Sequence, residues 1–84
     1  MSKEEIIKKL TEILSRNIAV PEDDIPKDAK LSGGTFDMDS IDFVEFISDV
    51  DVEFDTKLID LENSKLETID MISEQVLNLI NERT

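Results

Sequence analysis

The 84-residue chain contains no cysteine and no histidine. It therefore has no disulfide, no zinc site built on those ligands, no cysteine nucleophile and no usual general base at neutral pH. A chain this short also buries only about 60–65% of the surface that its unfolded form exposes, so a large enclosed active site is not expected. We predict one domain over residues 1–84 that is not an enzyme and that has no metal site.

Basic residues are scarce, with 9 Lys and Arg against 21 Asp and Glu, which gives a formal net charge of −12. This charge repels nucleic acid and anionic membranes and opposes self-association, so we expect a monomer with basic protein partners and no nucleic-acid ligand. No apolar run approaches the ~20 residues of a membrane span, and Met1-Ser2-Lys3-Glu4-Glu5 lacks a signal-peptide pattern. We expect no membrane span and a cytoplasmic protein.

Apolar residues recur at helical spacing in three stretches of the chain. They predict a first helix over about residues 3–17, opened by a capping box of Ser2 and Glu5, a second over 40–54 and a last over about 68–82. A short third helix is expected over about 60–64, with Leu61 as its one apolar anchor. Since no segment alternates as a strand, we predict an all-α fold, a small four-helix bundle.

A long loop over residues 18–39 joins the first two helices and contains every proline and glycine of the chain. A loop of about twenty residues in so small a domain needs apolar anchors in order to stay packed. The sequence supplies five candidates at intervals along it: Ile18, Val20, Ile25, Leu31 and Phe36.

The predicted helix over 40–54 separates an apolar side from an acidic side, at ~100° per residue. Its apolar side comprises Phe43, Phe46, Ile47, Val50 and Phe54, and the buried arc is widened by Val44. The acidic stripe on the other side comprises Asp42, Glu45, Asp49 and Glu53. Ile41 and Val52 project near this stripe, either as ordinary exposed residues or as the apolar centre of a docking patch. No Lys or Arg occurs between Leu31 and Thr56, and this one-signed field favours a surface for basic partners.

The second helix opens with Asp39-Ser40-Ile41, which places a hydroxyl at a helix N-terminus directly after the long loop. Unpaired backbone N–H groups and the positive end of the helix dipole favour an anion attached to Ser40 or bound beside it. Asp and Ser are also common N-cap residues, so an ordinary helix cap is the alternative interpretation.

Together these motifs resemble the acyl carrier protein family along the whole chain. The resemblance rests on three segments and on Phe36, four residues before the serine. The segments are Asp39-Ser40-Ile41-Asp42-Phe43-Val44-Glu45-Phe46, Asp51-Val52-Glu53-Phe54-Asp55-Thr56-Lys57-Leu58 and Leu66-Glu67-Thr68-Ile69. The chain departs from the family at Asp37, where Gly is usual, and at Ile59, where Pro is frequent. These departures make a pathway-specific carrier nearly as good an interpretation as a general fatty-acid carrier.

The resemblance implies the fold of that family and a covalent 4′-phosphopantetheine on Ser40, with Asp39 beside it. A phosphopantetheinyl transferase would attach this arm from coenzyme A, and the arm's thiol would carry an acyl group as a thioester. Acyl-loading and acyl-processing enzymes with basic docking surfaces would be the partners, in fatty acid or related polyketide, lipid or specialised biosynthesis. Candidate residues to line an acyl pocket are Phe43, Phe46, Ile47, Leu61 and Ile69.

Features of the sequence also suggest two functions other than a carrier. An unmodified adaptor of the same fold would bind a basic partner without an arm, and it differs only in whether Ser40 is occupied. A calcium-binding loop is suggested by the acidic alternation that starts at Asp37 and again at Asp49. Both frames lack the glycine needed at the sixth position, which is Asp42 in one and Phe54 in the other.

Overall fold

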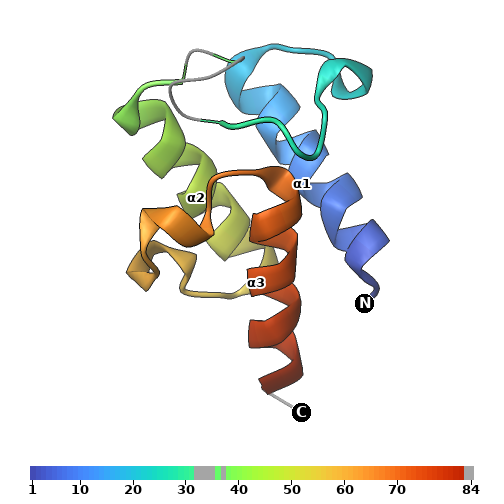
Figure 1. The fold of residues 1–84 in the computed structure, drawn as a ribbon, viewed down its shortest axis with the longest axis vertical. Coiled ribbons are helices and arrows are strands. Elements are labelled where there is room, and N and C mark those ends of the chain that lie inside the picture. The colour runs from blue at the N-terminus through green and yellow to red at the C-terminus, as the bar shows by residue number, and fades with distance from the viewer. Residues whose placement is uncertain (32–35, 37, 83–84) are drawn as a thin grey trace.

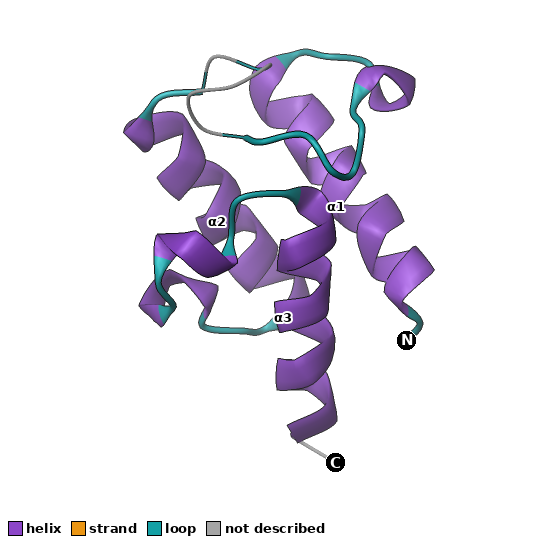
Figure 2. Ribbon diagram, viewed as in Figure 1, coloured by secondary structure: helices purple, strands orange, loops and turns teal. Residues whose placement is uncertain are grey.

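The computed structural model describes residues 1–31, 36 and 38–82 of the chain. Within these residues the chain forms three α-helices and no strand: α1 (Lys3–Ile18), α2 (Ser40–Phe54) and α3 (Ile69–Glu82) (Figures 1 and 2). Three short 3₁₀ turns connect them, at Glu22–Asp24, Leu58–Asp60 and Asn63–Lys65. The all-helical class is therefore confirmed, whereas the expected bundle of four helices is not.

The expected short helix over 60–64 is replaced by two separate 3₁₀ turns, each closed by its own bond. Leu61 N donates to the Leu58 carbonyl at 2.9 Å, and Leu66 N donates to the Asn63 carbonyl at 2.9 Å. Both are i to i+3 bonds, which close tighter and shorter turns than the α-helix. Leu58 and Leu66 are buried at the two ends of this segment. The few residues between these anchors cross the surface of the core and do not continue an α-helix.

The three helices surround one core, in which α1 packs against both α2 and α3. Figure 1 shows α2 and α3 running away from the end of the molecule where the long loop crosses, while α1 runs toward that end. α2 therefore begins at the loop end, and the start of α1 and the end of α3 lie toward the opposite end. The apolar side predicted for the second helix faces this core, because all five of its predicted residues are buried: Phe43, Phe46, Ile47, Val50 and Phe54.

The long loop is packed against the helices, as its apolar anchors predict. Ile25 and Leu31 are buried in the core, and the other three anchors are half-buried against it. Two backbone bonds hold the loop to the entry of α3. Leu31 N donates to the Glu67 carbonyl at 3.0 Å, and Asp70 N donates to the Lys27 carbonyl at 2.8 Å. These bonds satisfy loop groups that no helix or strand pairs.

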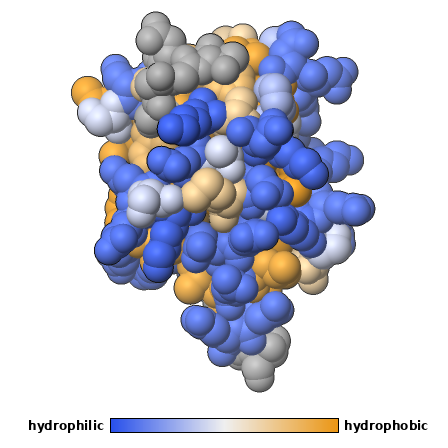
Figure 3. Space-filling model, viewed as in Figure 1, coloured by the Kyte–Doolittle hydropathy of each residue, from blue (hydrophilic) through white to orange (hydrophobic). Residues whose placement is uncertain are grey.

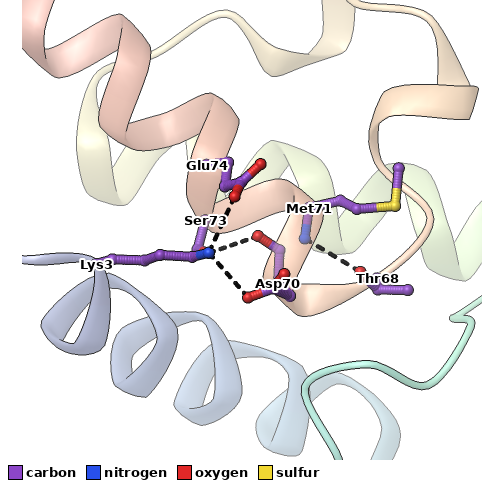
Figure 4. Close-up of polar contacts among 6 residues, drawn as sticks. All are labelled: Lys3, Thr68, Asp70, Met71, Ser73 and Glu74. Atoms are coloured by element: carbon purple, nitrogen blue, oxygen red, sulfur yellow. Dashed lines mark hydrogen bonds and ion pairs between the residues drawn. The ribbon is translucent and has the colours of Figure 1, made fainter.

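A polar cluster joins the start of α1 to the first turns of α3 (Figure 4). The Lys3 ammonium lies 3.0 Å from an Asp70 carboxylate oxygen and 3.1 Å from a Glu74 carboxylate oxygen. Hydrogen bonds to these two carboxylates raise the pKa of Lys3 above its usual value of 10.5. Thr68 caps α3, since its hydroxyl accepts from Met71 N at 3.1 Å. The cluster therefore links the exposed start of α1 to α3 beside the core that packs the two helices together.

Both ends of α1 have defined caps. At its start Ser2 and Glu5 form the predicted capping box, with Glu5 N donating to Ser2 Oγ at 3.2 Å and Ser2 N donating to the Glu5 carboxylate at 3.2 Å. Hydrogen bonds from the backbone and side chain of Ser2 lower the pKa of Glu5. At its end Ala19 takes the left-handed conformation, with φ of 56°. Alanine pays a steric penalty there that glycine would avoid.

Candidate functional site

The exposed hydroxyl of Ser40 lies on the first residue of α2. Asp39 is the N-cap, and its carboxylate accepts from Asp42 N at 2.8 Å while its carbonyl accepts from Phe43 N at 3.0 Å. The N–H groups of Ser40 and Ile41 form no recorded hydrogen bond with another described residue. The sequence therefore does form a capped helix here, and the cap leaves two first-turn donors beside the hydroxyl. Such donors, with the positive end of the helix dipole, favour a negative group on Ser40.

A pocket of about 500 Å³ opens beside Ser40, between α2 and the segment that leads into α3. Its described wall is mainly apolar, formed by Met38, Phe43, Val44, Ile47, Leu58, Ile59 and Leu66. The polar residues of the wall are Lys30, Ser40, Asn63, Ser64 and Glu67. An apolar pocket with a few polar groups is the usual form of a small-molecule site.

The candidate acyl-pocket residues divide between this pocket and the core. Phe43 and Ile47 are part of the pocket wall, whereas Phe46, Leu61 and Ile69 are not. Phe46 and Ile69 are fully buried, and Leu61 is half-buried against the core. Helical spacing identifies which residues face inward, but it does not distinguish a filled core from an open pocket.

Several wall residues were missed because they lie outside the predicted helix or on its other side. Met38 precedes α2, while Leu58 and Leu66 belong to the segment between α2 and α3. Val44, which was expected to widen the buried arc, is 46% exposed, so that expectation is wrong. The segment that faces Val44 leaves the pocket open there and does not cover the side chain.

The acidic stripe lies on the outer side of α2, with Glu45, Asp49 and Glu53 exposed and Asp42 half-buried. The two apolar residues predicted beside it are also exposed, Ile41 to 68% and Val52 to 83%. Asp49 has an internal partner, since its carboxylate accepts from the Asn17 side-chain amide at 3.0 Å. A second groove lies along this contact between α1 and α2, with Arg16, Asn17, Asp49, Val52 and Glu53 in its wall.

Asp51, although part of the same acidic run, has a structural role that the sequence pattern did not reveal. One carboxylate oxygen accepts from the Thr56 hydroxyl at 2.6 Å and from Leu58 N at 2.8 Å. The other accepts from Ile59 N at 3.2 Å. Because Leu58 and Ile59 are also wall residues, Asp51 positions one side of the pocket from the last turns of α2. The nearby Thr56, five residues on, was the signal available in the sequence.

The structure argues against the calcium-binding alternative. The second acidic frame, residues 49–53, lies inside the continuous helix α2 and forms no loop. The first frame starts at Asp37, which lies outside the described residues, and its sixth residue, Asp42, is again in α2. Across the part of the chain that the structure describes, no three Asp, Glu, His or Cys side chains gather in a group that could hold a metal ion.

Figure 3 shows one face of the molecule as largely hydrophilic, with hydrophobic residues in small separate areas. Within residues 1–31, 36 and 38–82, no helix combines the length and the apolar character that a membrane crossing requires. Taken with the site described above, the described residues form a small helical domain in which an exposed serine, at a helix N-terminus, lies next to an apolar pocket.

Comparison with known proteins identifies the class of such a domain. The family model described as the phosphopantetheine attachment site matches residues 8–76. An acyl carrier protein of Lactobacillus johnsonii is 35% identical over 69 residues, which cover 82% of this chain and 85% of that protein. One of Thermotoga maritima is 34% identical over 73 residues, 86% of this chain and 89% of that protein. One of Petrotoga mobilis is 30% identical over 83 residues, 99% of this chain and 92% of that protein.

The chain belongs to the acyl carrier protein family. Its cofactor is accordingly 4′-phosphopantetheine, and the chain is a carrier and not an enzyme. A phosphopantetheinyl transferase and acyl-processing enzymes are the general classes of partner that this membership implies. The absence of histidine and cysteine fits this role, because a carrier needs no catalytic base or nucleophile of its own.

Proposed function

We propose that Ser40 bears the 4′-phosphopantetheine arm, and that the protein delivers an acyl group, held on the arm as a thioester, to partner enzymes. The observation that carries this proposal is the position of one exposed hydroxyl at both a helix N-terminus and the mouth of an apolar pocket. When bound, the arm supplies the thiol that this cysteine-free chain lacks. The residues of the chain hold the arm's phosphate, shelter the cargo and meet the partners.

Other described serines do not combine these features. Ser2 caps α1 with its hydroxyl in contact with Glu5. The hydroxyls of Ser15 and Ser73 donate to backbone carbonyls, and Ser73 is buried. Ser48 lies within α2, and Ser64 is in a 3₁₀ turn, where no long helix supplies a dipole. Ser40 is therefore the attachment residue that the described structure supports best.

The phosphate of the arm fits the surroundings of Ser40. A phosphodiester there adds one negative charge at the N-terminus of a 15-residue helix, where the free N–H groups of Ser40 and Ile41 can donate to its oxygens. The Asp39 carboxylate is occupied in capping Asp42 N. Its role in the proposal is to begin the helix and so to orient the serine.

We further propose that the pocket shelters an apolar acyl chain, with Phe43 and Ile47 in its wall. Burying apolar surface contributes about 25 cal/mol for each Å² removed from water. A chain that occupies the pocket is thus stabilised in proportion to the apolar surface that it buries there. Phe46, Leu61 and Ile69 would support this wall from the core. The cargo belongs to fatty acid or to related polyketide, lipid or specialised biosynthesis.

The acidic stripe is the surface that we propose for partner docking. Asp42, Glu45, Asp49 and Glu53 offer charges of one sign to basic enzymes, and Ile41 and Val52 offer apolar contacts beside them. Charges at the rim of an interface mainly accelerate association, and such encounters weaken as salt rises. Brief, salt-sensitive contacts suit a cytoplasmic monomer that visits several enzymes in turn.

Incubation with coenzyme A and a promiscuous phosphopantetheinyl transferase tests the attachment. Intact mass should increase by one arm, and Ser40→Ala should abolish the increase, while Ser64→Ala at the same pocket should leave it unchanged. Peptide mapping of the arm to another serine, Ser32 included, would contradict the assignment of Ser40.

The adaptor alternative is tested by the intact mass of the protein isolated from its own host. A carrier yields a mass with the arm and, in part, with an esterified acyl group. A chain that carries no arm in the cell, although the transferase modifies it in vitro, would support the adaptor.

A further inference from the structure

Lys30 is the single cationic residue among the described residues that line the Ser40 pocket. It lies in the long loop, next to Leu31, whose backbone N–H is bonded to the Glu67 carbonyl at 3.0 Å. Lys30 itself is exposed, and no ion pair with a described residue is recorded for it. The bond of Leu31 holds the neighbouring Lys30 backbone beside the pocket, and the Lys30 ammonium group has no ion-pair partner among the described residues.

The charges around Ser40 make this one cation significant. No Lys or Arg occurs between residues 31 and 56, and this segment contains eight carboxylates: Asp37, Asp39, Asp42, Glu45, Asp49, Asp51, Glu53 and Asp55. A phosphate on Ser40 adds a further negative charge next to the Asp39 cap. The acidic stripe repels the phosphate from the outer side of α2, whereas Lys30 attracts the phosphate toward the pocket side.

We infer that Lys30 pairs with the phosphate of the arm on Ser40 and holds the first part of the arm at the mouth of the pocket. This inference rests on the proposed attachment to Ser40. The pair crosses from the long loop to α2, two elements between which the described residues form no ion pair. Lys30 is a positioning residue, because it directs the arm toward the pocket and takes no part in bond formation.

The test compares apo and arm-bearing forms of four proteins: the wild type, Lys30→Gln, Lys30→Arg and Lys27→Gln. Lys27 is the matched control, since it lies in the same exposed loop, its backbone carbonyl makes the bond to Asp70 N, and its side chain is outside the pocket wall. Excess transferase drives modification to completion, and intact mass verifies one arm on every variant. The measured quantity is the change in melting temperature on arm attachment at low salt and at about 1 M salt, where the Debye length falls to about 3 Å.

At low salt, the change in melting temperature on arm attachment should be more positive by about 1–4 °C in the wild type than in Lys30→Gln. This is the size expected for an exposed ion pair in a domain of this length. Lys30→Arg and Lys27→Gln should both show the same change in melting temperature as the wild type. High salt should remove the difference between the wild type and Lys30→Gln. Equal changes in the wild type and Lys30→Gln, or an equal loss in Lys27→Gln, would overturn the inference. A chain that accepts no arm, or that bears it on another serine in peptide mapping, refutes the proposed attachment instead, so intact mass and mapping together separate the two failures.

Discussion

Replacing Asp51 by alanine should destabilise the protein far more than any other change in its acidic run. The carboxylate accepts three hydrogen bonds, and two of the donors belong to buried residues, since Thr56 is 7% exposed and Leu58 is 0% exposed. A buried donor left without its acceptor costs about 1–3 kcal/mol. The third donor, the N–H of Ile59, belongs to a residue that is 51% exposed and can bind water instead.

We therefore expect Asp51→Ala to lower the free energy of unfolding by about 2–4 kcal/mol. This net value includes a gain of about a few tenths of a kcal/mol from reduced charge repulsion. A domain of this length has a total stability of about 4–13 kcal/mol. The loss corresponds to a fall of about 10–25 °C in melting temperature. Urea unfolding followed by circular dichroism measures the change, and hydrogen exchange at the Leu58 amide reports whether the pocket wall has loosened.

Glu53→Ala is the matched control, because it removes the same charge from the same helix at an exposed position whose side chain forms no hydrogen bond with a described residue. Its effect should stay within about 0.5 kcal/mol. Asp51→Asn should fall between the two, since the amide oxygen can still accept one of the bonds. If Asp51→Ala loses no more stability than Glu53→Ala, the Asp51 carboxylate does not hold the 58–60 turn.

Three further changes test the surface and the ends of α1. Glu45→Lys should slow association with the transferase several-fold at low salt and much less at high salt, as measured by stopped-flow kinetics. Glu4→Lys, at the far end of the molecule from Ser40, is the control and should have little effect. Equal losses in the two variants would mean that net charge alone recruits the enzyme. Ala19→Gly should raise stability by about 0.5 kcal/mol in urea unfolding, because relief of the left-handed strain exceeds the entropic loss, and a decrease would contradict that balance. Glu5→Ala should lower stability at neutral pH but not in acid. The folded pKa of Glu5 is depressed, so its contribution is present above the usual value of 4.5 and disappears as pH falls through the folded value. A stability difference between the wild type and Glu5→Ala that persists at pH values below the folded pKa of Glu5 would refute the capping role of the carboxylate.

The three α-helices and the position of the serine at the start of α2 followed from the sequence, for a local reason. Caps and helical periodicity are properties of residues a few positions apart, so Ser2 with Glu5 marked the start of α1, and Asp39 with the apolar side of α2 marked the start of that helix. Composition excluded thiol and imidazole chemistry without any structure. The one-signed charge between residues 31 and 56 was likewise visible in the sequence alone.

Only the tertiary structure decided what lies between those elements, because it depends on contacts between residues far apart in the chain. Two 3₁₀ turns stand where a helix over 60–64 was expected, and the Asp51 carboxylate of α2 holds the first of them by accepting from Leu58 N. Val44 stays exposed and the pocket stays open because the segment from Leu58 to Glu67 does not close over α2. Lys30 reaches the wall of the Ser40 pocket because its loop is bonded to Glu67, 36 residues after Leu31. Periodicity encodes which side of a helix is apolar, but the partner that covers that side, or leaves it open, is fixed only when the chain folds.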